Sequence, residues 1–364
     1  MAPRRWFTTK TAALAVLALT AGACGGNSGS GAPATVDGAA AEIAEGECVG
    51  STGDTVTIYS GRTENLIKPI LDAFVCDTGV GVRVRWGDST DLALLLDEEG
   101  GTTEADVFLS RSPGPVGFLE GKGLLGTLDD DTLDLVSDDN RAGSGAWIGF
   151  SGRKRVLVAN TDTVGEDDLP SGVLELTGEQ YRDRVAIPAT NGSFEDWFTV
   201  FRDQAGNEVA TRWLDDMVAN GARFYPNNRA IVEAVGRGEI DMGLVNHYYN
   251  HQEAAARGDE HRAENHDFAD DDIGSLLIIT AATVTAASDD TVNANALISY
   301  LLSEGAQRYF TDETFEYPLG AGVEANEVLP PLTALEIGAV DFDSLGGGFE
   351  ETEQIIQESG ILNN

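Results

Sequence analysis

The stretch "TVTIYSGRTENLIKPILDAFVCDTGVGVRVRW", Thr55 to Trp86, indicates how this chain folds. Thr55 to Ser60 is rich in β-branched residues and predicts a short strand. Glu64 to Gly79 has apolar residues at helical spacing and ends at a glycine, a residue that often terminates a helix. Val80 to Trp86 alternates as a second strand does. A strand, a helix and a strand in this order predict a parallel βαβ unit.

The alternation of strands and helices continues along the rest of the chain. Strands are predicted over residues 105–110, 155–160, 184–190 and 239–246, and more than one strand is predicted within 275–287. Helices are predicted over residues 89–100, 194–204, 208–221 and 228–238, and one long helix over 292–310. The chain of 364 residues is longer than one small core needs. We therefore predict an α/β fold of two doubly wound α/β lobes with an interlobe cleft. In open sheets of this kind, ligands bind beyond the carboxyl ends of the strands.

The N-terminus is typical of an export signal. A basic head at residues 4–10 precedes an apolar stretch, residues 11–23, that is too short to span a bilayer. We predict that residues 1–23 are a signal peptide, with the Sec and twin-arginine pathways both open. Small residues lead directly into Cys24 in "AGAC", which resembles a bacterial lipobox, so we expect Cys24 to be lipidated and to anchor the chain on the outer face of the cytoplasmic membrane. Residues 24–53, rich in Gly, Ala and Ser, are predicted to be a flexible tether.

Two further cysteines, Cys48 and Cys76, form an even pair in a chain that is expected to be exported. Outside the cytoplasm, such a pair is a candidate disulfide. The bond would join the segment before the first strand to the first helix.

The chain is strongly acidic, with 61 Asp and Glu residues against 23 Lys and Arg residues and a formal net charge of −38. General binding of nucleic acid or of anionic membranes needs a basic surface, so both are excluded. We expect membrane contact through the lipid anchor only. The acidic residues are spread through the chain, which is typical of a well-solvated surface.

Polar loops follow several predicted strands and open the helices that come next. These loops are residues 59–65, 188–194, 225–235 and 246–249. Helix N-termini present unpaired N–H groups that favour anions. In the last loop, Tyr248 and Tyr249 stand side by side where a buried strand should emerge. Neighbours in a strand point to opposite faces, so both phenols face one ligand only if the backbone there is irregular; otherwise the pair belongs to an aromatic core or surface cluster.

Several segments, taken in order, resemble the ferric-ion-binding family of periplasmic-type substrate-binding proteins, the receptors of ABC iron importers. They are "YSGR", "EEG" with "ADVF", "WIGFSGRKRVLVANTD", "PATNGSF", "YPNNRAIVEAVGRGEIDMGLVNHYYN" and a late "YPL". The likeness runs from Thr55 to near the C-terminus. It implies two lobes of the type II periplasmic binding protein kind, closing over Fe(III) about a hinge near residues 151–155 and 276–280. The implied bounds are 54–152 with 277–330 for the first lobe and 153–276 with 331–364 for the second.

The resemblance implies that Tyr248 and Tyr249 bind the metal as phenolates. Fe(III) is a hard cation that prefers anionic oxygen, and a trivalent charge favours phenolate although a free phenol has a pKa near ~10. The family often adds a synergistic anion such as carbonate or phosphate; the matching positions are Asn191, Gly192, Ser193, Asn228 and Asn246, with Arg153 near the hinge. The loop "TNGS" equally predicts a plain helix cap, and Arg153 or Arg155 an ordinary ion pair.

The chain departs from the family in the first lobe. Thr63 and Glu64 stand where several relatives carry histidine and some carry tyrosine. Arg111 replaces a carboxylate found in others, and Asn191 a third tyrosine found in some. Glu64 is the best remaining metal ligand, or else an acid that complements its helix dipole. Tyr59 is a second candidate ligand, although its place in a strand equally predicts packing. Arg111 would repel a bare cation but suits a bound anion or chelate.

These observations predict an extracytoplasmic receptor, not an enzyme, that captures Fe(III) with a small anion and delivers it as a monomer to an ABC permease and its ATPase. Two alternatives stay open: the same fold binding a phosphonate, a polyamine or an intact ferric chelate, and an exported metal-dependent hydrolase. The chain has no recognisable nucleophile motif. His247 and His251 lack the intervening glutamate of a zinc protease, and we expect them to be solvated.

Overall fold

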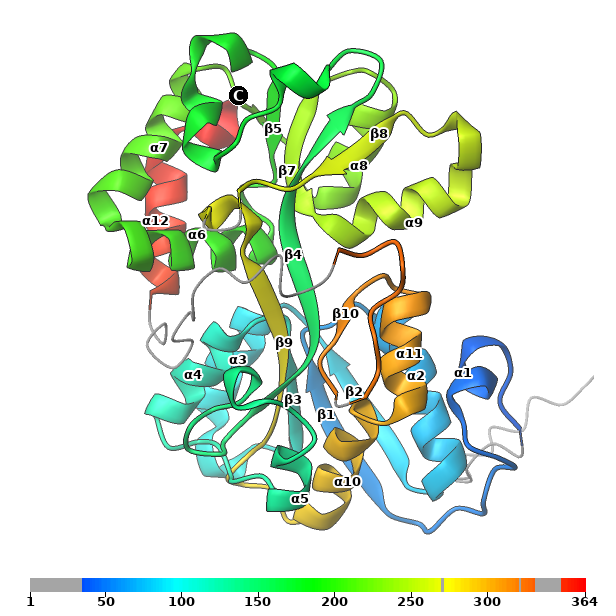
Figure 1. Cartoon of the computed structure of the whole chain (residues 1–364). Helices are drawn as coiled ribbons and strands as arrows, with labels where there is room; N and C mark the ends of the chain where they lie inside the picture. Colours follow the sequence, from blue (N-terminus) through cyan, green and yellow to red (C-terminus); the bar gives the residue numbers. More distant parts are fainter. Residues whose placement is uncertain (1–34, 270–271, 321, 331–347) are drawn as a thin grey trace, which may run out of the picture. The chain divides into compact units, whose positions relative to one another are not determined.

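The strands of the computed structural model form one mixed sheet of order β2-β1-β3-β9-β4-β7-β5-β6, with β8 and β10 also paired to β4 (Figure 1). The structure describes residues 35–269, 272–320, 322–330 and 348–364. The pairs β1–β2, β1–β3, β5–β6 and β5–β7 are parallel, whereas the described pairings of β4 and of β9 are antiparallel. The strands are β1 (Thr55–Ser60), β2 (Gly81–Trp86), β3 (Val107–Ser110), β4 (Ile148–Asn160), β5 (Val185–Ile187), β6 (Arg223–Phe224), β7 (Met242–Asn246), β8 (Ala263–His266), β9 (Leu277–Val284) and β10 (Tyr317–Pro318).

Helices cover both faces of each half of the sheet (Figure 1). In the first half, α2, α10 and α11 pack on one face and α3 and α4 on the other. In the second half, α6, α7 and α12 cover one face, and α8 covers the other together with α9. The helices are α1 (Gly38–Ile43), α2 (Glu64–Thr78), α3 (Ser89–Glu99), α4 (Pro113–Gly121), α5 (Asp130–Leu133), α6 (Gly192–Ala205), α7 (Asn207–Ala219), α8 (Asn228–Gly236), α9 (His247–Arg257), α10 (Thr291–Leu301), α11 (Glu304–Asp312) and α12 (Phe349–Ser359).

Two long strands, β4 and β9, connect the halves (Figure 1). β4 pairs with β9 up to Lys154 and with β7 from Arg155 onward. The chain therefore has two doubly wound lobes joined by crossover strands, which confirms the predicted fold class. The lobe bounds given above stay a prediction, and residues 331–347 lie outside the described part of the chain.

Some predicted elements differ from the structure. The expected single helix over residues 292–310 is two helices, because the side chain of Ser303 accepts a hydrogen bond from the backbone N–H of Ala306 and starts α11. The strands expected within 275–287 are one strand, β9. The predicted tether contains helix α1, whose Ala40 and Ile43 are buried against the first-lobe core.

The predicted disulfide between Cys48 and Cys76 is present and joins the segment before β1 to α2. The predicted signal peptide and the lipidation site Cys24 lie outside the described residues. Within the described part of the chain, no helix is both long enough and apolar enough to cross a membrane.

Candidate functional site

A cavity of about 190 Å³ lies where loops of both lobes meet beside β4. The first lobe contributes the segment after β1 and the residue after β3; the second contributes the start of α6 and the junction of β7 with α9. Its described lining residues are Arg62, Thr63, Leu66, Arg111, Arg153, Asn191, Ser193, Asn246, Tyr248 and Tyr249. The cavity lies beyond the carboxyl ends of β1, β3, β5 and β7, where the strand order predicted it.

The two tyrosines lie together in the first turn of α9. β7 ends at Asn246 and α9 begins at His247, so the irregular backbone that we expected here is in fact helical. The rings of Tyr248 and Tyr249 stack with their centroids 4.2 Å apart, and both residues line the cavity. Burial and the neighbouring Tyr249 raise the pKa of Tyr248 well above its usual value. The phenol of Tyr248 is therefore neutral at physiological pH until a cation displaces its proton.

The predicted anion loop is held by a network of amides and hydroxyls. Asn191 caps α6, since its Oδ1 accepts hydrogen bonds from the backbone N–H and the hydroxyl of Ser193. The Nδ2 of Asn228 donates to Asn191 Oδ1 over 3.0 Å, and its Oδ1 accepts from the backbone N–H of Asn246. Asn191, Ser193 and Asn246 reach the cavity, Gly192 opens α6 beside them, and Asn228 is buried behind them. The predicted helix cap is therefore present.

Two successive inward-facing arginines of β4 behave differently. Arg155 donates hydrogen bonds to Asn228 and to the backbone carbonyl of Ser193, so it supports the loop from behind. Arg153 is 2% exposed and lines the cavity, yet its Nε and Nη2 have no hydrogen-bond partner among the described residues. Burial lowers the pKa of the Arg153 guanidinium. The predicted alternative of an ordinary ion pair is not found for either arginine within the described part of the chain.

The first lobe supplies different residues from those expected. Thr63 lines the cavity, but Glu64 is an exposed first residue of α2 and is not among the described lining residues. The hydroxyl of Tyr59 donates to Glu99 over 3.0 Å, so this phenol points to the α3 side of β1. The structure therefore brings neither predicted first-lobe ligand to the cavity, because a helix start turns Glu64 outward and packing holds Tyr59.

Two cavity arginines from the first lobe already have partners. Arg62, which the sequence did not single out, is buried and pairs with buried Glu316 over 2.6 Å. Arg111 donates from Nε to the carbonyl of Gly61 and lies 3.4 Å from an Asp88 carboxylate oxygen. The sequence signals for Arg62 were its place directly after β1 and its position in the segment "YSGR". Among the described residues, no group of three or more His, Cys, Asp or Glu side chains could hold a metal ion.

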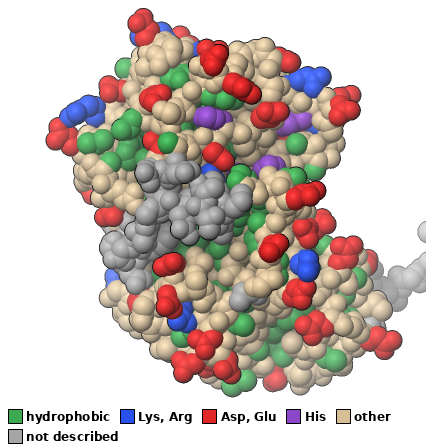
Figure 2. Space-filling model, in the orientation of Figure 1, with side chains coloured by type: hydrophobic (Ala, Val, Ile, Leu, Met, Phe, Trp, Pro, Cys, Tyr) green, Lys and Arg blue, Asp and Glu red, His purple; other side chains and the backbone are tan. Residues whose placement is uncertain are grey.

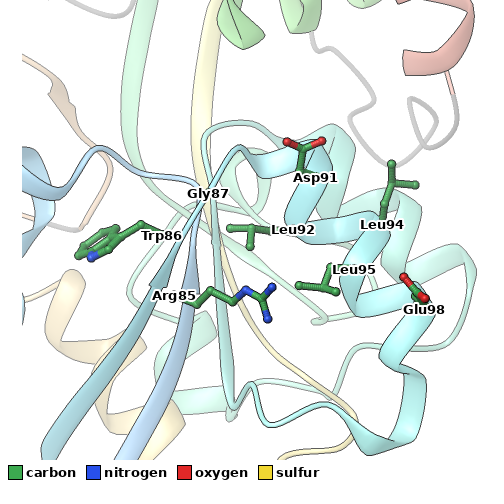
Figure 3. Close-up of a pocket in the computed structure, with 8 residues that line it drawn as sticks. All are labelled: Arg85, Trp86, Gly87, Asp91, Leu92, Leu94, Leu95 and Glu98. Carbon is green, nitrogen blue, oxygen red and sulfur yellow. The ribbon is translucent and has the colours of Figure 1, made fainter.

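A second hollow of about 430 Å³ lies between the end of β2 and α3 (Figure 3). It is lined by Arg85, Trp86, Gly87, Asp91, Leu92, Leu94, Leu95 and Glu98. In Figure 3, Trp86 points away from the α3 side chains. Trp86 and Leu94 are exposed, and this hollow has no buried unpaired polar atom among its described lining residues. It lacks the features of a specific polar binding site.

Comparison with known proteins gave consistent matches. Residues 103–342 match the model of a family described as bacterial extracellular solute-binding proteins. The chain is 29% identical to an Fe(3+)-binding periplasmic protein of Serratia marcescens, over 88% of this chain and 94% of the relative. It is 28% identical to a major ferric iron-binding protein of Neisseria meningitidis, over 84% and 93%. Iron-bound HitA from Pseudomonas aeruginosa has a similar structure, with a TM-score of 0.79, 31% identity, and coverage of 84% of this chain and 99% of that one.

Proposed function

Because the chain belongs to the family of bacterial extracellular solute-binding proteins, we propose that it captures Fe(III) together with a small anion for import. Members of this family bind solutes and are not enzymes. The observation that carries the proposal is the stacked pair of Tyr248 and Tyr249 in a cavity that also contains the buried guanidinium of Arg153. The relatives named for ferric iron binding support the choice of metal.

The tyrosines supply the donors that Fe(III) prefers. Each phenol gives one anionic oxygen once its proton is displaced, and hard anionic oxygen suits Fe(III) better than imidazole or thiolate does. The raised pKa of Tyr248 means that an apolar or neutral solute would meet a neutral phenol. A trivalent cation stabilises the phenolate through its own charge and so offsets the free energy of deprotonation. The site therefore favours highly charged cations.

The remaining ligands of the metal come from an anion, in this proposal. Neither Glu64 nor Tyr59 is among the described residues that line the cavity. Two phenolates alone therefore leave most of the metal's coordination positions unfilled. The buried guanidinium of Arg153 lacks a carboxylate partner among the described residues. Asn191 and Ser193 add an amide and a hydroxyl at the start of α6, where backbone N–H groups favour anions. Carbonate and phosphate both fit this combination of charge and hydrogen-bond donors.

The arrangement of the lobes supports capture by closure. Tyr248, Tyr249, Asn191 and Ser193 belong to the second lobe, and Arg62, Thr63 and Arg111 to the first. A ligand held from both sides stabilises the closed lobes and is released when they open. We further propose that the monomeric receptor is anchored through Cys24 outside the cytoplasmic membrane and delivers its cargo to an ABC permease and its ATPase.

The test is the colour of the iron-loaded protein. Purified protein mixed with Fe(III) and bicarbonate should develop a visible phenolate-to-iron charge-transfer band. Tyr248→Phe and Tyr249→Phe should each shift or abolish the band and weaken iron binding. Tyr300→Phe is the matched control, because its hydroxyl donates to Asp77 in the first lobe and is not among the described lining residues of the cavity.

A second candidate, binding of an intact ferric chelate, is favoured by the guanidiniums of Arg62, Arg111 and Arg153 around one cavity. Titration with Fe(III) plus bicarbonate and with ferric citrate separates the two. A band that forms only with the polycarboxylate complex would support the chelate. A protein that stays colourless with both, and binds a phosphonate or a polyamine instead, would refute ferric binding.

A further inference from the structure

A second polar cavity lies on the opposite face of β4 from the iron site. It measures about 330 Å³, the lower end of the range for small-molecule pockets, which is about 300–1,000 Å³. Its described lining residues are Lys154, Val156, His247, Asn250, His251, Ala254, Ala263, Glu264, Asn265, Asp267, Tyr317, Val328 and Pro330. We call it the rear cavity. Figure 2 shows histidine side chains gathered on this face over β8 and α9.

β4 and the start of α9 line both cavities, with neighbouring residues facing different cavities. Successive residues of a strand point to opposite faces. Arg153 of β4 accordingly lines the iron site, and Lys154 and Val156 line the rear cavity. At the start of α9, His247 faces the rear cavity while Tyr248 faces the iron site. His247 is 2% exposed, so the prediction that it is solvated was wrong.

The rear cavity contains polar atoms that the described protein does not satisfy. Tyr317 is completely buried, and its hydroxyl has no hydrogen-bond partner among the described residues. The same holds for Asn265 Oδ1, whose amide group instead donates to His251 and to the backbone of His247. A buried polar group left unpaired costs about 1–3 kcal/mol, so such groups commonly mark the place of a water or a ligand.

The charges around the rear cavity have both signs. Lys154, which is 1% exposed, pairs with Asp267 over 2.7 Å, and the exposed Glu264 stands at the rim. His247 Nδ1 accepts a hydrogen bond from the backbone N–H of Lys154, which leaves the proton of the ring on Nε2. An anion that carries no positive group would be repelled by Asp267 and Glu264, and a cation that carries no negative group would be repelled by Lys154.

We propose that the rear cavity binds a small zwitterion of amino-acid size, with its carboxylate toward Lys154 and Tyr317 and its ammonium toward Asp267 and Asn265. Such a ligand uses both members of the Lys154–Asp267 pair and satisfies the two unpaired polar atoms. The aliphatic parts of Val156, Ala254 and Ala263 suit a short apolar side chain.

The position of the rear cavity connects it to lobe movement. Tyr317 lies on β10, which pairs with the first-lobe part of β4, whereas α9 and β8 belong to the second lobe. A ligand that contacts both sides has a different affinity for open and closed lobes. Linkage then requires that iron and the zwitterion change each other's affinity by the same factor. This last step rests on the proposed iron function; binding itself does not.

The experiment is isothermal titration calorimetry of the full iron-free protein with L-alanine, L-proline and glycine betaine. Propionate and ethylammonium serve as half-molecules that lack the amine and the carboxylate. We expect saturable binding of at least one zwitterion and none of the half-molecules. Asp267→Asn should weaken it about tenfold or more, the loss expected for a charged hydrogen bond. Tyr317→Phe should weaken it several-fold without lowering the unfolding midpoint, because the missing hydroxyl had no partner.

Two variants outside the rear cavity serve as controls. Tyr300→Phe should bind the zwitterion like the unmodified protein. Tyr249→Phe should retain zwitterion binding while its iron band shifts or disappears, so the two proposals fail separately. Absence of binding by all three zwitterions would overturn the proposal, as would equal binding of a half-molecule or unchanged affinity in both Asp267→Asn and Tyr317→Phe.

Discussion

Replacing Arg153 with methionine should stabilise the empty protein and weaken anion binding at the same time. The guanidinium is 2% exposed, and Nε and Nη2 lack partners in the described part of the chain. A buried charge without a partner costs several kcal/mol, part of which nearby Glu316 and Asp196 offset. In iron-free protein without carbonate or phosphate, we expect Arg153→Met to raise the free energy of unfolding by about 1–3 kcal/mol.

The same substitution would remove the only cationic donor of the proposed anion site that has no carboxylate partner among the described residues. Hydrogen bonds to charged groups contribute about 1.5–3 kcal/mol, which corresponds to a roughly 10- to 150-fold loss of anion affinity. Urea unfolding measures the first effect. Calorimetric titration of iron-loaded, carbonate-free protein with phosphate measures the second.

Arg155→Met is the matched control, because Arg155 is the next inward-facing residue of β4 and is also buried. It donates three hydrogen bonds, to Asn228 and to the carbonyl and hydroxyl of Ser193. Its loss should destabilise the protein by about 1.5–4.5 kcal/mol at roughly 0.5–1.5 kcal/mol per hydrogen bond. If Arg153→Met destabilised the empty protein as much as Arg155→Met does, or left phosphate affinity unchanged, the assignment of Arg153 to the anion would be refuted.

Three further predictions follow from buried groups elsewhere. Burial raises the pKa of Asp196 to about 7 and that of Glu195 to about 8. Near neutral pH the folded protein therefore holds protons that the unfolded chain releases, and its unfolding free energy should fall as pH rises from about 5 to 8. Urea unfolding of Asp196→Asn over the same pH range should show a smaller fall. Replacing Glu316 with glutamine leaves the buried Arg62 cation uncompensated and should cost about 3–5 kcal/mol in unfolding free energy, whereas Glu304→Gln, on an exposed pair with Arg308, should cost less than about 1 kcal/mol. Reducing the Cys48–Cys76 bond, 28 residues apart, should lower the unfolding free energy by about 2–4 kcal/mol, and an unchanged denaturation midpoint would contradict a stabilising role.

The secondary structure was predictable wherever the local signal was complete. Thr55 to Trp86 forms β1, α2 and β2 as expected, because β-branched strands and a C-terminal glycine indicate the same boundaries. The helix cap expected in the loop "TNGS" is also present, at Asn191. The break before α11 was missed although Ser303 is a favoured N-cap residue, because the apolar pattern continues through it.

The sequence predicted in part which distant residues come together at the cavity, and it did so for a physical reason. Parallel strands bring their carboxyl ends to one edge, so Asn191 and Tyr248 could be expected to meet although 57 positions separate their numbers in the chain. The pairing of Arg62 with Glu316 has no such rule, because it joins a loop after β1 to the residue before β10. Likewise, local sequence does not state that Tyr59 turns toward Glu99, since strand residues face either side according to packing.

The acidic surface contrasts with the buried guanidinium of Arg153 in the proposed iron site, and this contrast bears on the order of binding. The chain carries a formal net charge of −38, and Figure 2 shows acidic side chains over the visible face with few basic ones. That surface attracts cations in general and does not select among them. The cavity, in contrast, contains Arg153, which has no carboxylate partner among the described residues, besides Arg62 and Arg111, which are paired with Glu316 and Asp88. The phenol of Tyr248 is neutral without a cation. A bare trivalent ion would meet positive charge before it reached a phenolate, whereas an anion would be attracted to Arg153. We therefore expect the anion to bind before the metal or with it, so that stopped-flow formation of the iron band should become faster as bicarbonate concentration rises.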